Sequence, residues 1–180
     1  NQLREVSIID LLGRNEVHLE ENLIEEYIHG KRVLITGAGG SIGSELVRQC
    51  LKYEPALLVM LDNSELNLFQ IEREILGKPT NVLTKPLLSN IRDLDILGKV
   101  FNEYEPQVVF HAAAYKHVAM QEAFPWEAIK TNVHGTTNLV KLSLDHNVEK
   151  FVLVSTDKAV KPINVMGATK RLAELICQGA

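Results

Sequence analysis

A strand, a glycine-rich turn and a helix follow one another over residues 31–45, and this order constrains the fold more than any other stretch. The apolar run over residues 33–35 is long enough for a buried strand and too short for a helix. Four glycines follow within residues 37–43, and a helical apolar spacing begins at Ile42. This order is typical of a dinucleotide-binding fingerprint, in which glycines let the backbone approach a pyrophosphate. The helix N-terminus adds free N–H groups and a partial positive charge for the phosphates.

Glycine-rich turns also occur where they only join two elements, so a purely structural turn is the alternative interpretation. The position between a buried strand and an amphipathic helix favours nucleotide binding. The residues of this stretch that we expect at the cofactor are Thr36, Gly37, Gly39, Gly40, Ser41, Ile42 and Gly43.

Length and composition limit the classes of protein to which the chain can belong. At 180 residues it can bury one hydrophobic core, and no apolar run approaches the ~18 residues of a membrane span. A net charge of −4 argues against nucleic-acid binding, which needs clustered Lys and Arg. Cys50 and Cys177 lack metal-site spacing, so we expect no metal and two reduced thiols of a cytosolic protein, with a disulfide as the alternative. The opening residue, Asn1, indicates a piece excised from a longer protein.

We expect two parts, an N-terminal helical arm over residues 1–30 and a Rossmann domain over residues 31–180. In the arm, apolar residues cluster within residues 6–12, and a helical apolar spacing covers residues 19–28. Gly30 is placed to end that helix as a C-terminal cap. The arm is expected to pack on the following domain or on another subunit.

An acidic residue ends the second predicted strand, which covers residues 56–61. Asp62 lies roughly 20 residues beyond the last fingerprint glycine, the spacing expected for a carboxylate on the adenosine ribose. A carboxylate there accepts hydrogen bonds from both ribose hydroxyls and repels a 2′-phosphate, so NAD is favoured and NADP is the alternative. Asn63 and Ser64 are also expected at the cofactor. Asp62 can instead cap the helix expected over residues 64–76.

The rest of the chain continues the alternation of strands and helices. A weaker strand over residues 81–88 contains Pro86, which favours a short strand or an edge position. Further strands are expected over residues 108–110 and 151–155, and helices after residues 89–93 and over residues 126–146. This alternation predicts an α/β fold, namely a Rossmann-like, doubly wound parallel sheet with strand order 3-2-1-4-5.

Small and polar residues beyond the strand ends complete the predicted cofactor site. Asn90 is placed to face an adenine amine, and the alanines after the fourth strand let a cofactor lie against the backbone. The alternative for these alanines is helix-to-sheet packing. The additional residues expected at the cofactor are Ile91, Ala112, Ala113, Ala114, Lys116, Asn132, Ser155 and Lys170.

The candidate catalytic residues follow the fifth strand, at the sheet edge where ligands bind in such folds. Asp157 and Lys158 are adjacent there and can supply one acid and one base. Met166 and Lys170 are four residues apart and share one helical face. The alternative has Asp157 capping a turn and Lys158 solvated. The residues expected to be catalytic are Thr156, Asp157, Lys158, Met166 and Lys170.

Several runs of residues together resemble one enzyme family. The fingerprint Thr36–Gly43, together with Lys170, is similar to the extended short-chain dehydrogenases/reductases. The runs that narrow this resemblance are His111–His117, Asn132–Thr136 and Ser155–Ala159. They resemble the membrane-associated nucleotide-sugar 4,6-dehydratases of bacterial polysaccharide and glycan biosynthesis, the CapD/WbpM/PglF type. The opening segment, residues 3–14, resembles the segment that precedes their catalytic domain.

This resemblance implies a UDP-N-acetylglucosamine substrate, or a related UDP-N-acetylhexosamine, with bound NAD(P) and a 4-keto-6-deoxy sugar product for capsule or lipopolysaccharide. It also implies a homo-oligomer at the cytoplasmic face of the bacterial inner membrane. Membrane attachment would come only from segments missing from this chain, which is itself expected to be soluble. Such enzymes continue beyond Ala180 with a sixth strand and a smaller sugar-binding portion.

In the implied reaction a hydride leaves the sugar C4, the C5 proton is removed, the C6 hydroxyl departs, and the hydride returns to C6. The resemblance makes Asp157 the acid and Lys158 the base, and assigns Lys170 to the nicotinamide ribose. Lys158 must then lose its proton, which burial and a nearby Lys170 would promote. Met166 stands where ordinary family members carry Tyr, as it does in the large dehydratases of this subgroup. A thioether exchanges no proton, so Thr156 is the nearest candidate to receive the 4-hydroxyl proton.

Two other classes of function stay open. Nucleotide-sugar epimerases and C5-inverting dehydratases share the fold, and an epimerase needs no acid–base pair beyond the C4 chemistry. The non-enzyme alternative is a catalytically silent NAD-binding module, which Met in place of Tyr would favour. The adjacent Asp157 and Lys158 argue against both the epimerase and the silent module.

Overall fold

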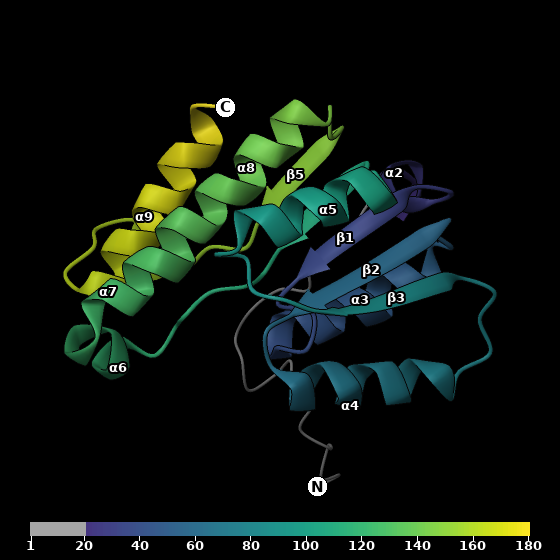
Figure 1. Ribbon diagram of the computed structural model, residues 1–180, viewed down its shortest axis with the longest axis horizontal. Helices are drawn as coiled ribbons and strands as arrows, with labels where there is room; N and C mark the ends of the chain where they lie inside the picture. The colour runs from purple at the N-terminus through teal and green to yellow at the C-terminus, as the bar shows by residue number, and fades with distance from the viewer. Residues whose placement is uncertain (1–20) are drawn as a thin grey trace, which may run out of the picture.

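A five-stranded parallel sheet forms the centre of the computed structural model, which describes residues 21–180, with side chains from residue 23 on. Its strands are β1 (Arg32–Thr36), β2 (Leu57–Asp62), β3 (Leu83–Leu88), β4 (Val108–His111) and β5 (Lys150–Leu153). The strand order is β3-β2-β1-β4-β5, and every neighbouring pair is parallel (Figure 1). The predicted doubly wound α/β fold and its strand order are therefore confirmed.

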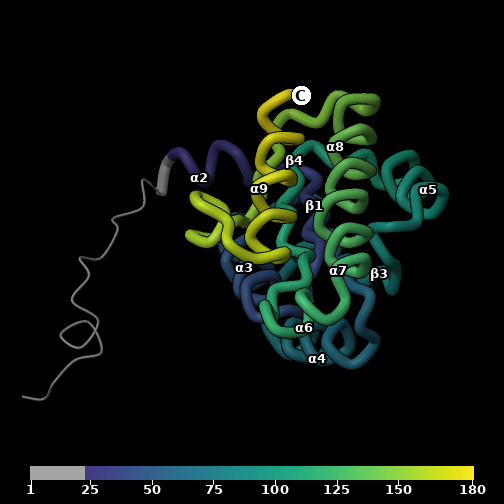
Figure 2. Tube along the Cα trace, turned by 90° about the vertical axis from the view of Figure 1, so that its left-hand side faces the viewer, coloured from purple at the N-terminus to yellow at the C-terminus, as the bar shows by residue number. Residues whose placement is uncertain are grey.

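Helices cover both faces of this sheet. They are α2 (Glu21–Ile28), α3 (Ser41–Lys52), α4 (Glu65–Leu76), α5 (Leu94–Tyr104), α6 (Val118–Ala123), α7 (Pro125–Ala128), a π-helix η1 (Ile129–Gly135), α8 (Thr136–Asp145), a 3₁₀ turn η2 (Asp157–Ala159) and α9 (Val165–Gln178). On one face, Val33 and Ile35 pack with apolar residues of α2, α3 and α4. On the other face, Leu34 packs with residues of α5 and α8. Figure 2 shows α3 and α5 on opposite sides of β1.

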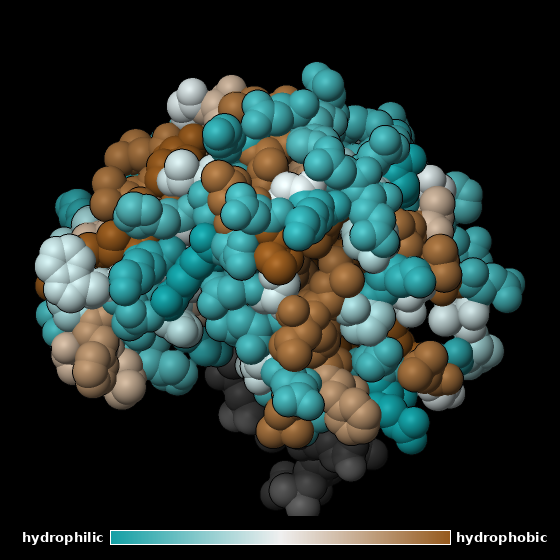
Figure 3. All heavy atoms as spheres, viewed as in Figure 1, coloured by the Kyte–Doolittle hydropathy of each residue, from teal (hydrophilic) through white to brown (hydrophobic). Residues whose placement is uncertain are grey.

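Burial on both faces explains why the strands are continuous apolar runs rather than alternating ones. All six residues of β2 are buried, because β2 lies between β1 and β3 and under two helix layers. The edge strand β3 is different: Leu83 and Leu88 are more than half exposed. Figure 3 shows apolar side chains interspersed with hydrophilic ones on the face that carries β3 and α5. Pro86 lies in β3 opposite Met60, which confirms the predicted edge position.

Several predicted boundaries differ from the structure, those of most strands by one or two residues. The helix expected over residues 126–146 is a succession of α7, η1 and α8, with a π-helical segment in the middle. Thr131, Asn132 and Gly135 of that segment are buried, and a Cβ on Gly135 would lie 2.5 Å from Ile91 Cδ1. The apolar spacing of the sequence does not reveal the π-helical segment, because the residues that pack around η1 are distant from it in sequence. The fifth strand also ends at Leu153 rather than Ser155.

The helix before the sheet agrees with its prediction. Gly30 follows α2 with a φ of 68°, a left-handed conformation that suits a glycine at a helix end. Ile28 is buried in the core beside α3, and the Tyr27 ring lies 4.5 Å from the Lys150 ammonium. The predicted apolar cluster at residues 6–12 lies outside the described residues. Cys50 and Cys177 are both free thiols, as predicted. Between residues 21 and 180, no helix combines the length and the apolar character needed to cross a bilayer.

Candidate functional site

An open groove of about 640 Å³, including its mouth, lies at the carboxyl ends of β1, β2 and β4. Parallel strands bring their carboxyl ends to one edge, so segments far apart in sequence meet there. Ten of the residues predicted at the cofactor line this groove: Gly37, Gly40, Asp62, Asn63, Ser64, Asn90, Ile91, Ala112, Ala113 and Ala114. Five other lining residues were not predicted: Leu61, Asn67, Ser89, Tyr115 and Thr131.

The glycine turn of residues 37–43 lies at the bottom of the groove, and its glycines are required because a larger residue would collide with neighbouring backbone atoms. Gly37 has a φ of 69°, and a Cβ on it would lie 2.6 Å from the Ala113 backbone nitrogen. A Cβ on Gly43 would collide with the Gly37 carbonyl oxygen, so α3 can start this close to the turn only with glycine. The predicted alanines 112–114 lie against this turn, and Ala112 N donates to Thr36 O at 3.0 Å.

Asp62 is held at the groove wall by backbone donors. One carboxylate oxygen accepts from Gly39 N at 2.8 Å, and the other accepts from Ser64 N at 2.8 Å. The alternative that Asp62 caps α4 is wrong, because the cap is Ser64, whose hydroxyl accepts from Asn67 N. Asp62 is only 6% exposed, and it ties the glycine turn to the start of α4. Its carboxylate therefore has a fixed position in the groove.

The other residues predicted at the cofactor do not line the groove. They are Thr36, Gly39, Ser41, Ile42, Gly43, Lys116, Asn132, Ser155 and Lys170. Thr36 and Asn132 are buried, whereas Ser41 and Ile42 are exposed at the start of α3. Ser155 and Lys170 lie farther along the sheet edge, after β5 and on α9.

Asn132 is a structural side chain in this arrangement rather than a groove residue. Its Oδ1 accepts from Tyr115 N at 2.8 Å, and its Nδ2 donates to Tyr115 O and to Thr169 Oγ1, both at 3.0 Å. The amide is 1% exposed and its hydrogen-bonding groups are engaged. It therefore fixes the loop after β4 against η1 and α9, and with it the place of Tyr115 at the groove.

A buried histidine at the end of β4, His111, connects β1 to the start of α8. The Thr136 hydroxyl donates to Asn132 O at 2.7 Å, so its oxygen accepts from His111 Nε2 at 2.9 Å. His111 Nδ1 is then the acceptor for the Thr36 hydroxyl, at 2.7 Å. This network holds a neutral imidazole, and burial lowers the pKa of His111 to about 3, with a smaller contribution from the charge of Lys170.

We expect this imidazole to make folding sensitive to acid. The unfolded histidine takes up a proton near its ordinary pKa of 6.5, whereas the folded one stays neutral down to a pKa of about 3. Between pH 6.5 and pH 3 the unfolded state therefore binds more protons than the folded state. The contribution of His111 to the unfolding free energy is thus fully present above pH 6.5. That contribution falls by up to about 1.4 kcal/mol per pH unit as the pH drops toward 3. Urea unfolding at pH 7 and pH 5 measures the loss, which should be smaller in His111→Gln. Equal losses in both proteins would refute this expectation.

The candidate acid and base lie in an exposed turn after β5. The Thr156 hydroxyl donates to Asp157 Oδ1 at 2.9 Å, and the Lys158 ammonium lies 3.3 Å from the same oxygen. The Asp157 side chain is 85% exposed and the Lys158 side chain 50%, so the expected burial of Lys158 is absent. The Thr156 hydroxyl and then the Lys158 ammonium hold the pKa of Asp157 below its usual range. Thr156, and not Asp157, caps the turn, since its oxygen accepts from Lys158 N.

Helix α9 places the other two candidates on a buried face. Asn164 caps the helix, with Oδ1 accepting from Gly167 N at 2.7 Å. Met166 is 4% exposed and Lys170 6% exposed. The Lys170 ammonium donates to Val154 O at 2.6 Å, and burial lowers the pKa of this lysine. Lys170 is thus fixed beneath the end of β5. Within residues 21–180 no group of three His, Cys, Asp or Glu side chains could hold a metal ion.

Known proteins resemble this chain in sequence and in fold. CapD, a capsular polysaccharide biosynthesis protein of Staphylococcus aureus, is 43% identical over 99% of this chain and 30% of its own length. A UDP-N-acetylglucosamine 4,6-dehydratase (inverting) of Campylobacter jejuni is 34% identical over 79% of this chain and 41% of its own length. The crystal structure of a Bifidobacterium longum UDP-glucose 4-epimerase in complex with NAD⁺ and UDP has a TM-score of 0.70 and 27% identity, over 82% of this chain and 48% of that one.

The chain therefore spans less than half the length of each of these relatives. The model of the family described as "Polysaccharide biosynthesis protein" matches residues 33–180, from β1 to the last residue of the chain. The matched stretch contains the glycine turn, the groove and the turn with Asp157 and Lys158. The resemblance to the CapD type of nucleotide-sugar dehydratases is confirmed, and the chain belongs to the polysaccharide biosynthesis protein family.

Proposed function

We propose that this chain is the cofactor-binding and catalytic part of an NAD-dependent nucleotide-sugar 4,6-dehydratase acting on UDP-N-acetylglucosamine or a related UDP-N-acetylhexosamine. In this proposal residues 31–180 form the Rossmann domain and residues 1–30 an arm. The observation that carries it is the Asp157–Lys158 pair, 3.3 Å apart at the carboxyl edge of the sheet. An adjacent acid and base at this edge suit an elimination, which must remove one proton and supply another. The similarity to the Campylobacter jejuni dehydratase supports the substrate class.

The residues of the groove fit NAD. Gly37 and Gly39 carry no side chain, which lets the backbone of the turn approach a pyrophosphate, and a Cβ at either position would collide with Ala113 or Asn67. The fixed carboxylate of Asp62 can accept hydrogen bonds from an adenosine ribose. Asn90 lines the same groove after β3, the strand next to β2. The NAD⁺ bound in the Bifidobacterium longum epimerase supports this cofactor.

Bound NAD would supply reversible hydride transfer, accepting the hydride of the sugar C4 and returning it at C6. In this proposal Lys170 holds the nicotinamide ribose, and the Thr156 hydroxyl takes up the 4-hydroxyl proton while passing its own proton to solvent. Lys158 removes the C5 proton, and Asp157 protonates the departing C6 hydroxyl. Met166 exchanges no proton.

The acid and base roles require a drier site than the exposed turn of this chain. Thr156 and Lys158 lower the pKa of Asp157 further below neutral pH, so this carboxyl carries no proton to donate in the exposed turn. Removing water from an Asp–Lys pair favours the neutral forms of both groups. We therefore propose that a sugar-binding portion of the whole protein, together with the sugar itself, covers this turn during the reaction.

Incubation of the full-length protein with NAD and UDP-N-acetylglucosamine, followed by NMR of the product, tests the function. We expect a 4-keto-6-deoxy sugar, whose C5 configuration the coupling constants would also reveal. A product changed only in configuration at C4 would instead identify an epimerase. Bound NAD without any turnover on UDP-sugars would identify a silent binding module.

Asp62 should set the choice between NAD and NADP. Its carboxylate would repel a 2′-phosphate, so calorimetric titration is expected to show tighter binding of NAD than of NADP. Asp62→Ala should narrow the gap, because the repulsion and the ribose hydrogen bonds are both lost. If NADP bound to the unmodified chain as tightly as NAD, the proposed role of Asp62 in cofactor choice would be wrong.

A further inference from the structure

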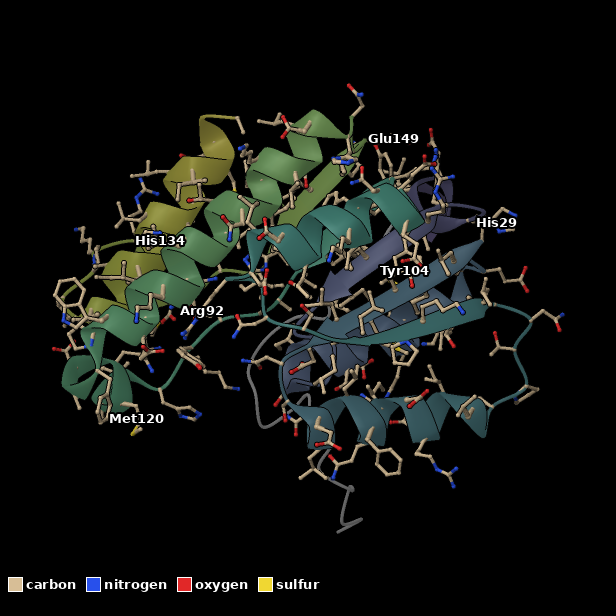
Figure 4. The ribbon with its side chains drawn as sticks, viewed as in Figure 1. His29, Arg92, Tyr104, Met120, His134 and Glu149 are labelled. Carbon is tan, nitrogen blue, oxygen red and sulfur yellow. The ribbon has the colours of Figure 1, made fainter. Side chains whose placement is uncertain are left out.

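Arg92 lies behind one wall of the groove and contacts both the loop after β4 and the helical run formed by α7 and η1. Its Nε and Nη2 both donate to Thr131 Oγ1, at 2.8 and 2.5 Å. Its Nη1 lies 2.7 Å from Glu127 Oε2, and its guanidinium carbon lies 5.5 Å from the centre of the Tyr115 ring. In Figure 4, Arg92 lies beside the helical run that contains η1. One side chain thus joins α7, η1 and the loop after β4.

The backbone of Arg92 is as firmly held as its side chain. Asn138 Nδ2 on α8 donates to Ile91 O at 3.1 Å and to Arg92 O at 3.2 Å. Asn90 Oδ1 accepts from Arg92 N at 3.0 Å. Asn90 and Ile91 line the groove, so the backbone position from which the Arg92 side chain extends is fixed relative to the groove. Its guanidinium then reaches Tyr115 and Thr131, which also line the groove.

The guanidinium is suited to this position in a way that an ammonium is not. Its planar fork donates to a hydroxyl and a carboxylate in different directions while its face meets an aromatic ring. Hydrogen bonds from a charged donor are stronger than neutral ones, and a cation over an aromatic ring adds attraction. The Arg92 side chain is only 25% exposed, so solvent screens these contacts little. Asn132 fixes the backbone of Tyr115, and Arg92 is the cation over its ring.

We propose that Tyr115 and Thr131 are nucleotide-binding residues at the adenosine end of the groove, and that Arg92 is a positioning residue that holds their side chains in place. This inference rests on the proposed binding of NAD. The side of the groove opposite Asp62 is then a wall whose shape Arg92 fixes before the nucleotide binds. Such pre-organisation increases affinity by reducing the ordering that binding requires.

Calorimetric titration of the chain with ADP-ribose and with NAD⁺ tests this role. Arg92→Met should weaken both ligands by roughly tenfold, the equivalent of about 1.4 kcal/mol of binding free energy. Arg92→Lys should recover little of the loss, since an ammonium cannot donate as a fork. Tyr115→Phe keeps the ring and should weaken binding far less than Tyr115→Leu. Circular dichroism and thermal unfolding establish that each variant is folded.

A double-mutant cycle separates positioning from a general loss of stability. If Arg92 acts through Tyr115, Arg92→Met and Tyr115→Leu together should weaken ADP-ribose binding by less than the product of the separate effects. Arg48→Met is the matched control. Arg48 on α3 also donates two hydrogen bonds, to the two carboxylate oxygens of Glu74 on α4, but it does not line the groove. It should leave both affinities unchanged.

The outcomes distinguish this inference from the proposed function. Wild-type affinity in Arg92→Met, or independent effects in the cycle, would overturn the positioning role while NAD binding itself stood. A wild-type chain that bound neither ADP-ribose nor NAD⁺ would overturn the proposed function and this inference with it. An equal loss in Arg48→Met would show that any broken ion pair weakens binding, and would likewise overturn the role of Arg92.

Discussion

Lys158→Met in the full-length protein is expected to stop elimination of water from the sugar while leaving NAD bound. Lys158 is the proposed base for the C5 proton, and loss of a positioned base costs about 10²–10⁴ in rate. Methionine keeps much of the length of the side chain and removes only the titratable group. Oxidation at C4 uses other residues, so this variant should still form some enzyme-bound NADH, visible in its near-ultraviolet absorbance. Product formation is followed by NMR and NADH by absorbance on the same sample.

Two companion variants test the division of roles. Asp157→Asn removes the proposed acid, so it should slow departure of the C6 hydroxyl but still allow exchange of the C5 proton with D₂O. Met166→Ala should cost far less than either change, because the thioether carries no proton. If Met166→Ala were as damaging as Lys158→Met, or if Asp157→Asn were near wild type, the acid–base assignment would be wrong.

Gly37→Ala is expected to abolish measurable NAD binding and to destabilise the fold. A left-handed backbone in a residue other than glycine costs about 1–3 kcal/mol, and Gly37 has a φ of 69°. The added Cβ would also lie 2.6 Å from Ala113 N and 2.7 Å from Ala113 Cα, where backbone atoms of β1 and the β4 loop cannot easily separate. We expect the affinity for NAD⁺ to fall by roughly a hundredfold or more, the equivalent of about 2.7 kcal/mol. Urea unfolding and calorimetric titration measure the two effects.

Gly98→Ala is the matched control for this change. Gly98 lies within α5, where an added Cβ would meet no atom within 4 Å. Alanine in a helix interior is favoured over glycine by roughly 0.5–1 kcal/mol, so this variant should be slightly more stable than the wild type. Its NAD affinity should be that of the wild type. Similar losses in both variants would mean that the position of Gly37 in the turn has no special importance.

The architecture could be predicted from the amino-acid sequence, because each feature behind it is local. Short apolar runs specify strands buried on both faces, and the glycines of residues 37–43 specify where the chain can turn tightly beside another strand. Pro86 marked an edge strand, since proline cannot donate to a ladder hydrogen bond. Ten groove residues were predicted in the same way, as positions that immediately follow strand ends in a parallel sheet.

Contacts between side chains of distant segments could not be predicted in this way, because they depend on how the elements pack. Arg92 and Thr131 are 39 residues apart, and Thr36 and His111 are 75 apart, yet both pairs share hydrogen bonds. Periodicity reports whether a residue is buried or exposed, but its partner depends on how distant elements pack. The π-helical segment, the buried role of Asn132 and the exposure of Lys158 follow from that packing. The strand and turn patterns therefore predicted where a nucleotide would bind, and tertiary contacts decided which residues shape its groove.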